Sequence, residues 1–345
     1  MKTTAKTFYD CNGTPFQVTV LTIGGKKPGP VFTIISGQHG MEHSGPCFLP
    51  ELAEELDKTD FAGTMHICPC ANPGALALDY ELYPEHEDLS KINDYYYSPY
   101  RHSYSPWGLS RKECPGQKGY NMNRTWNRSG KGLAYDITSW LWKEFVEPAK
   151  FTLDIHCAQH RKPFIFNYFE KNNEFAAVTG FPGVNLSLPP ADPHNQGNLN
   201  FQASNREGHH SLCFEFSVQH GLKEHEYPPG KNAIKNLMIK LGMLDAEPVL
   251  PANPVWAFPL REFPDCGAVL KNEHHGHIRY FFDEYDEVKK GDILYEVRDI
   301  QTLEVIEQGI SPLDGIMHNI NILPLASPGR KACNVYMAKQ LKPEF

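Results

Sequence analysis

The sequence predicts an α/β protein in which helices cover both faces of a mixed β-sheet, followed by a small all-β domain. Two observations indicate this fold class. Over the first two thirds of the chain, short apolar runs alternate with amphipathic stretches, which is typical of a sheet covered by helices. Beyond a proline-rich segment at 244–259, the pattern changes to short strands separated by turns.

The larger part of the fold rests on six predicted strands and three predicted helices. One strand, 31–37, is apolar throughout rather than alternating, as expected when both faces of a sheet are covered. The predicted strands are 16–24, 31–37, 64–72, 151–158, 163–170 and 211–219, and the predicted helices are 45–58, 134–147 and 232–244. This alternation predicts a mixed sheet between two layers of helices.

The C-terminal third is predicted to form strands within 286–299, 310–319 and 331–340. Gly291 and Gly315 lie between apolar runs, so we expect them in hairpin turns. With 345 residues, the chain is long enough for two domains. We predict a larger domain at residues 1–246 and a smaller one at 247–345.

Composition and charge exclude several classes of function. The formal net charge is −8 and no Lys/Arg cluster stands out, which argues against a nucleic-acid partner. No stretch of 18 apolar residues occurs and residues 1–16 lack the apolar core of a signal peptide, so we expect a cytoplasmic protein without a membrane partner. Nine irregularly spaced cysteines fit free thiols in a reducing compartment.

One long segment, 73–121, shows little periodicity and contains a stretch rich in Tyr, Ser and Pro at 92–107. A loop of this length inside a domain is usually functional or disordered, and the tyrosines argue against disorder. Two interpretations stay open: an insertion packed near the pocket, or a folded surface excursion with no role in chemistry.

Polar side chains gather where three of the predicted strands end. His39 and Glu42 directly follow 31–37, and Asp154 and His156 lie two apart in 151–158, so that they share one face. Glu215 is a carboxylate among apolar neighbours, where an unpaired charge is costly. Ligand sites of open α/β sheets lie beyond the carboxyl ends of the strands, so we expect these groups to meet.

These residue types point to metal-assisted hydrolysis. Two histidines and one carboxylate are the protein ligands of a common catalytic zinc site, which leaves a fourth position open. A glutamate elsewhere in the chain then serves as general base, which completes the chemistry. For Asp154 two interpretations stay open: it orients a ligand or the loop, or it is a carboxylate satisfied at the end of its strand.

Five motifs, in this order, resemble the succinylglutamate desuccinylase/aspartoacylase family, a branch of the zinc carboxypeptidase superfamily: SGQHGMEHSGP, ANPGAL, NMNRTW, LDIHCA and CFEFSVQHG. The resemblance spans nearly the whole chain, because VKKGDILYEV and ISPLDGIM resemble the biotinyl/lipoyl-type β-barrel at the end of many members. It implies a carboxypeptidase-like sheet and a barrel-like C-terminal domain. That domain has no lysine at its hairpin tip for a carrier group, and is expected to shape the pocket mouth or a homo-oligomer contact.

The resemblance also implies roles for individual residues. His39 and Glu42 correspond to the H-x-x-E zinc ligands of the family and His156 to its third ligand, so one zinc ion per chain is expected. Glu215 corresponds to the catalytic glutamate.

Asn123 and Arg124 stand where the family usually has D-L-N-R, a pair that holds the carboxylate of the substrate. The chain departs from the family at two positions. Asn121 replaces the acidic residue of that motif, and Gly74 stands where aspartoacylases tend to carry a further arginine. That second arginine is Arg101 or Arg111, or it is missing, which leaves the identity of the substrate open.

The resemblance therefore implies a zinc-dependent deacylase that cleaves the amide bond of an N-acylated amino acid or a similar small carboxylate. Metal-activated water would attack the amide, with Glu215 as general base. Two alternatives stay open: a metallocarboxypeptidase acting on peptides, and a catalytically inactive module that binds a metabolite.

Overall fold

The computed structural model describes residues 1–9, 13, 15–77, 122–158, 160–190, 195–219, 221–250 and 254–345. The Tyr-rich segment 92–107, Arg101, Arg111 and Asn121 lie outside these residues, so the predictions made for them stay untested.

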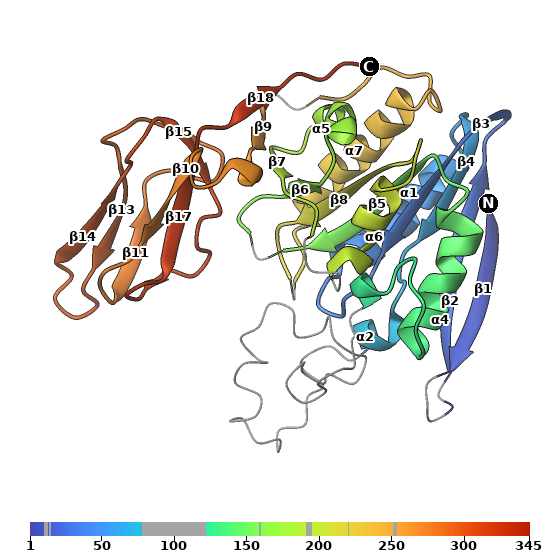
Figure 1. Ribbon diagram of the computed structural model, residues 1–345, viewed down its shortest axis with the longest axis horizontal. Coiled ribbons are helices and arrows are strands. Elements are labelled where there is room, and N and C mark those ends of the chain that lie inside the picture. Colours follow the sequence, from blue (N-terminus) through green and yellow to red (C-terminus); the bar gives the residue numbers. More distant parts are fainter. Residues whose placement is uncertain are drawn as a thin grey trace.

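A mixed sheet of ten strands forms the centre of the larger part of the molecule (Figure 1). Strands β4, β3, β5 and β8 are parallel neighbours in its middle, and antiparallel pairs flank them. In spatial order the strands are β1 (Lys2–Tyr9), β2 (Pro15–Gly24), β4 (Ala62–Cys68), β3 (Lys27–Ser36), β5 (Phe151–Cys157), β8 (His210–Phe216), β6 (Phe164–Asn167), β7 (Gly183–Leu186), β9 (Val255–Phe258) and β18 (Lys339–Leu341). The predicted mixed α/β sheet is thus confirmed.

Helices cover both faces of this sheet (Figure 1). Successive residues of β3 show the two layers, because Ile34 packs in one core cluster and Ile35 in the other. The first cluster joins the sheet to α1 (Ser44–Asp57), α5 (Asn173–Thr179) and α7 (Tyr227–Lys240), and the second joins it to α4 (Leu133–Leu141) and α6 (Leu199–Ser204). Strand β5 lies in the middle with all seven residues buried, so its polar side chains need partners within the protein.

Two predicted helices differ from the structure in their bounds. Segment 134–147 is not one uniform helix, because α4 ends at Leu141 and the chain continues as a π-helical segment to Val146. Helix α7 begins at Tyr227, five residues before the predicted start, because its prolines occupy the first turn, where a backbone N–H has no helical partner to lose. A short helix, α2 (Pro73–Ala77), follows β4.

The C-terminal strands form two four-stranded antiparallel sheets, drawn in orange and red in Figure 1. One sheet contains β10 (Gly267–Lys271), β17 (Lys331–Tyr336), β15 (Gly315–His318) and β12 (Glu287–Val288), and the other β14 (Val305–Ile310), β13 (Ile293–Arg298), β11 (Gly276–Tyr280) and β16 (Leu325–Ala326). Apolar side chains of both sheets form one buried cluster. Closure of these sheets into a barrel stays a prediction.

The predicted hairpin turns at Gly291 and Gly315 are wrong. Gly291 lies in a turn with φ of 97°, but that turn joins β12 to β13, which belong to different sheets. Gly315 is the first residue of β15 and pairs with Val288, because a turn further upstream reverses the chain. Glycine between apolar runs therefore marked a turn in one case and a strand in the other.

Strands β9 and β18 lie C-terminal to the predicted domain boundary at residue 246, and yet they extend the ten-stranded sheet. The division of the chain into two domains stays a prediction. Among the described residues, no helix is both long and apolar enough to cross a lipid bilayer.

Candidate metal centre

The loop between β3 and α1 carries His39 and Glu42. Its backbone is anchored at the start, where Asn72 N donates to Gly37 O (2.9 Å). Gly37 has φ of 63°, and a Cβ at this position would lie 2.8 Å from backbone atoms, so only glycine fits without strain. The loop then turns tightly, with Glu42 N donating to His39 O (3.2 Å). A fixed backbone therefore holds an imidazole and a carboxylate at the carboxyl end of β3.

Strands β5 and β8 bring the remaining predicted residues beside this loop. Asp154 and His156 lie two apart in β5, and His156 is directly opposite Glu215 in the parallel pair formed with β8. The register also places Cys213 opposite Asp154. The parallel pairing thus places polar groups of two strands side by side near the carboxyl ends of these strands, as predicted from their positions in the sequence.

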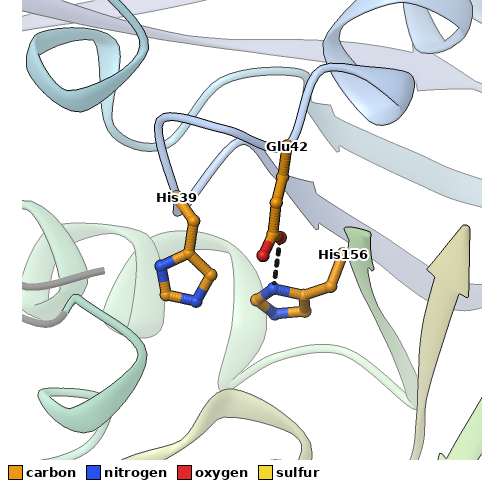
Figure 2. A group of neighbouring side chains, drawn as sticks. All are labelled: His39, Glu42 and His156. Atoms are coloured by element: carbon orange, nitrogen blue, oxygen red, sulfur yellow. Dashed lines mark hydrogen bonds and ion pairs between the residues drawn. The ribbon is translucent and has the colours of Figure 1, made fainter. Parts of the chain in front are cut away.

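His39, Glu42 and His156 form a buried group that could hold a metal ion (Figure 2). Each offers one ligand atom, and the three atoms all lie within 4.8 Å of one another. Glu42 Oε2 accepts a hydrogen bond from His156 Nδ1 at 2.9 Å, drawn as the dashed line in Figure 2. The imidazole and carboxylate donors and their burial fit a zinc ion with an open fourth position.

Asp154 contacts the other side of the His156 ring. Its Oδ1 lies 2.8 Å from His156 Nε2, while Nδ1 faces Glu42. A ring nitrogen held by a carboxylate fixes the orientation and tautomer of a metal-ligating histidine. The geometry therefore favours the first interpretation of Asp154, a residue that orients a ligand.

Two glutamines that the sequence analysis did not single out complete the surroundings. Gln38 Nε2 donates to Asp154 Oδ1 (2.7 Å) and its Oε1 accepts from Trp126 Nε1 (2.6 Å). Gln219 Nε2 lies 3.3 Å from Glu42 Oε1. Both glutamines belong to the quoted motifs, and their place there was the signal available in the sequence. Gln38 directly precedes His39, and Gln219 follows Glu215 by four residues.

The charges in this group are tightly coupled. Burial alone would lower the pKa of His156, but the charges of Asp154 and Glu42 and their hydrogen bonds raise it well above the usual range. Without a metal ion, the two carboxylates therefore favour the protonated form of the His156 imidazole. A divalent cation at the same place supplies the positive charge that this arrangement requires, so the residues fit a metal.

Asp154, His156 and Cys213 form a second group with suitably close ligand atoms. Burial raises the pKa of the Cys213 thiol well above its usual range, and the nearby charges of Glu215 and Asp154 raise it further. A thiol binds a metal as the thiolate, which these carboxylates disfavour. The first group, which keeps Asp154 for orienting His156, is the better candidate.

Glu215 is a carboxylate with an altered proton affinity. Burial raises its pKa to about 8, an effect that the charge of His156 opposes and the charges of Glu42 and Asp154 reinforce. A cation at the neighbouring group would oppose the shift, because positive charge favours the ionised carboxylate. A pKa within reach of neutrality suits a residue that both takes up and releases a proton.

Asn123 and Arg124 lie in a short 3₁₀ segment, Met122–Arg124. Asn123 is 9% exposed, and its Nδ2 lies 3.1 Å from His156 Nε2, while its Oδ1 accepts from Leu199 N (2.9 Å). The structure therefore places Asn123 against a candidate metal ligand, a contact that the predicted role in substrate binding did not include.

All six predicted site residues line one cavity of about 630 Å³. They are His39, Glu42, Asn123, Arg124, His156 and Glu215. The structure thus brings together residues that are up to 176 positions apart in the sequence. This volume suits a small molecule, since pockets for such ligands typically measure about 300–1,000 Å³.

The cavity has further lining residues that sequence analysis did not predict as site residues. Asn319 and Lys331 come from the C-terminal strands and the loops beside them, and His160 follows β5. No local pattern in the C-terminal third distinguishes Asn319 or Lys331 from surface residues, so only the three-dimensional structure reveals them.

Comparisons with solved structures identify similar folds along nearly the whole chain. A protein from Shewanella amazonensis SB2B assigned to the succinylglutamate desuccinylase/aspartoacylase family is 14% identical with a TM-score of 0.70, covering 99% of this chain and 100% of that one. An aspartoacylase family protein from Mesorhizobium loti is 17% identical with a TM-score of 0.63, covering 98% and 95%. The product-bound ectoine utilization protein EutE (DoeB) from Ruegeria pomeroyi is 17% identical with a TM-score of 0.62, covering 96% and 93%.

No protein-family model and no curated protein sequence matches the chain. At these low identities, the similarity to solved structures establishes the fold. The resemblance to this family that the sequence motifs predicted is confirmed at that level.

Proposed function

We propose that this chain is a zinc-dependent amidohydrolase that removes the acyl group from an N-acylated amino acid or a similar small carboxylate. The observation that carries the proposal is the meeting of His39, Glu42, His156 and Glu215 in one cavity of about 630 Å³. Solved structures of similar fold from the desuccinylase/aspartoacylase family support a deacylase, and the bound product in the EutE structure supports a small-molecule substrate.

In this proposal His39, Glu42 and His156 hold the metal ion, and Asp154 keeps the His156 ring oriented. A bound zinc ion would supply Lewis-acid chemistry, polarising the amide carbonyl and making water more acidic. The buried position of the three ligands limits competition from bulk water for the same site.

Glu215 performs the proton transfers. Its carboxylate accepts a proton from the attacking water and passes it to the amide nitrogen as the carbon–nitrogen bond breaks. The products are a free carboxylic acid and a free amine, so that the atoms of water are distributed between them. The position of Glu215 opposite His156 in the β5–β8 pair places it beside the proposed metal ligands.

Arg124 is proposed to bind the carboxylate of the substrate. Arg124 lines the cavity, and a guanidinium group offers a planar pair of donors that matches the geometry of a carboxylate. Asn123 lies directly beside it and contacts His156, so in this proposal it joins the substrate-binding part of the cavity to the metal site.

The direct test compares Glu215→Gln with wild-type protein. We expect unchanged zinc content and a kcat lower by about 10²–10⁴-fold on an N-acyl amino acid, because general base catalysis contributes that much. Glu287→Gln, an exposed change on β12, is the matched control and should behave as wild type. Near-normal turnover by Glu215→Gln would contradict the mechanism, and activity only on longer peptides would favour a carboxypeptidase.

A further inference from the structure

A series of hydrogen bonds runs from the apolar core to the candidate metal centre. It begins at Trp126, a buried side chain in the core cluster that joins the sheet to α4 and α6. Trp126 Nε1 donates to Gln38 Oε1 (2.6 Å), and Gln38 Nε2 donates to Asp154 Oδ1 (2.7 Å). Asp154 Oδ1 in turn lies 2.8 Å from His156 Nε2. Two side chains, Gln38 and Asp154, therefore connect a tryptophan of the core to a proposed metal ligand.

The direction of these hydrogen bonds is fixed at the Trp126 end. An indole nitrogen is a donor only, so the Gln38 atom that faces it is the amide oxygen. The amide nitrogen of Gln38 then faces Asp154, where it can only donate, so Asp154 Oδ1 is an acceptor. Turning the Gln38 amide around would place a donor against the indole and leave its buried N–H without a partner, which is costly.

The same direction continues to the ring of His156. Three atoms lie near its Nε2, namely Asp154 Oδ1 at 2.8 Å, Asn123 Nδ2 at 3.1 Å and Gln38 Nε2 at 3.3 Å. The two amide nitrogens are donors, so Asp154 is the acceptor for a proton on Nε2. A proton held on Nε2 leaves Nδ1, which faces Glu42, as the ring nitrogen available to a metal ion.

Gln38 has a defined place behind the cavity. It is buried, and its backbone oxygen accepts from Asn72 Nδ2 (3.1 Å). Among the residues that the structure describes, those that line the cavity include neither Gln38 nor Trp126. These two residues can therefore affect the site only through their neighbours, and not by contact with a substrate.

Asp154 depends on the donor that Gln38 supplies. The residue is buried, and its other oxygen, Oδ2, has no hydrogen-bond partner among the described residues. Gln38 and His156 thus provide the hydrogen bonds of this carboxylate, both at Oδ1. Because a buried carboxylate with too few donors is unfavourable, loss of the Gln38 amide would weaken the hold of Asp154 on the His156 ring.

We propose that Trp126 and Gln38 are positioning residues that set the affinity of the site for its metal ion. Trp126 orients the Gln38 amide, Gln38 keeps Asp154 as an acceptor, and Asp154 keeps the proton of His156 on Nε2. This inference rests on the proposed function, because it takes His156 as a metal ligand. Replacing a residue that orients a ligand commonly lowers metal affinity by about 10–100-fold. Here the effect extends one residue further, to a tryptophan of the core.

The test measures the dissociation constant of zinc for the full-length protein by competition with a chelator. Trp126→Phe keeps an aromatic ring in the core but removes the N–H, so zinc should bind about 5-fold more weakly, the effect of one neutral hydrogen bond. Gln38→Met removes the donor to Asp154 as well and should weaken binding by about 10–100-fold. The double variant should lose no more than Gln38→Met alone, because Trp126 acts through Gln38.

Gln38→Glu separates hydrogen bonding from packing, and it decides the question even if Trp126→Phe does not fold. It keeps the length of the side chain and an acceptor for Trp126, but it offers Asp154 no amide donor. Zinc should bind to it no more tightly than to Gln38→Met. Wild-type affinity in Gln38→Glu would show that only the shape of residue 38 matters, and would overturn the inference.

Trp142→Phe is the matched control, because Trp142 is a buried tryptophan of the same core cluster and lies outside the cavity lining. It should bind zinc as tightly as wild type does. Wild-type affinity in Gln38→Met, or losses that add up in the double variant, would overturn the inference.

The measurement distinguishes this inference from the proposed function, because it records metal binding and not turnover. A protein that shows the expected losses of zinc affinity but hydrolyses no N-acyl amino acid would contradict the deacylase and support the roles of Trp126 and Gln38. A protein that hydrolyses such a substrate but binds zinc equally well as wild type and as Gln38→Met would do the reverse.

Discussion

The cavity has two walls that are built in different ways. The metal wall contains His39, Glu42, His156 and Glu215, and the C-terminal wall contains Asn319 and Lys331. On the side of the ten-stranded sheet, strand register alone places His156 beside Glu215, and a tight loop adds His39 and Glu42. On the C-terminal side, one buried carboxylate, Glu284, accepts hydrogen bonds from both parts of the chain. The comparison teaches that sheet topology brings together the chemical groups of this site, whereas one buried side chain connects the C-terminal side of the cavity to the rest of the protein.

The two walls also differ in the charge states they maintain. In the metal wall, the carboxylates Glu42 and Asp154 raise the pKa of His156, so positive charge is held there. In the C-terminal wall, burial would raise the pKa of Glu284, but the hydrogen bonds and charges of His160 and His318 bring it well below its usual range. If the walls are independent, substitutions in one should leave the function of the other unchanged.

The largest effect is expected in the metal wall. His156→Ala removes a proposed metal ligand and the partner of Asp154, so zinc content should fall from about one ion per chain to near zero. Hydrolysis should fall by about 10³-fold or more, since the Lewis acid is lost. Elemental analysis and steady-state kinetics measure the two outcomes.

The matched control is His277→Ala, an exposed histidine on β11, which should keep its metal and its activity. A His156→Ala protein that retains zinc would show that the proposed ligand set is wrong.

A smaller effect is expected in the C-terminal wall. Glu284→Gln leaves buried N–H groups facing an amide that can no longer accept from all of them, and should lower the free energy of unfolding by about 3 kcal/mol. Urea denaturation measures this loss, and exposed Glu287→Gln on β12 should show none. Zinc content should stay at the wild-type level.

The contribution of Glu284 to the free energy of unfolding should depend on pH. Because its pKa in the folded protein lies below the ordinary 4.5, its stabilising effect is complete above that pH and is lost as the pH falls further. The difference in stability between wild type and Glu284→Gln should therefore shrink below about pH 4.5. A constant difference down to pH 3 would mean that Glu284 is not ionised in the folded state.

The smallest effect is expected at His209, which directly precedes β8, lies 2.8 Å from the Thr152 hydroxyl through its Nε2 and does not line the cavity. Burial lowers the pKa of His209 from 6.5 to about 3, helped by the positive charges of Arg206 and Lys171. The unfolded chain then binds more protons below pH 6.5, so stability falls as the pH decreases from 6.5 towards 3. Because of His209, the free energy of unfolding should be about 2 kcal/mol lower at pH 5 than at pH 7.

His209→Asn should flatten this part of the stability curve, as measured by urea denaturation from pH 7 to pH 5. His277→Asn, at an exposed position, should leave the curve unchanged. A wild-type slope in His209→Asn would assign the acid sensitivity to other groups.

Much of the central sheet could be predicted from the sequence. The segments 31–37, 151–158 and 211–219 became β3, β5 and β8. Segment 31–37 is apolar throughout because a strand buried on both faces leaves a continuous apolar pattern. The short strands near the β18 edge of the sheet could not be predicted. Val255–Phe258, for example, lies within the proline-rich segment, and its pairing depends on β7 and β18, which are distant in the sequence.

The candidate site also contains residues that could be predicted from the sequence and contacts that could not. Residues His39, Glu42 and His156 could be predicted, since polar groups at the ends of buried strands are conspicuous. The contact between Asn123 and His156 could not, because it depends on a 3₁₀ turn brought to β5 by tertiary packing. The place of Lys331 in the cavity lining has no local signal in the sequence, since a lysine at the start of a strand is common on protein surfaces.

The origin of the cavity from both early and late parts of the chain has a consequence for biosynthesis. During synthesis, His39 is added to the chain long before Lys331. At about 5–20 residues per second, the interval between them is roughly 15–60 s. During that time the nascent protein can assemble its central strands, but the wall that contains Lys331 does not yet exist. A newly made chain would therefore acquire its candidate metal ligands first and the C-terminal side of its cavity last.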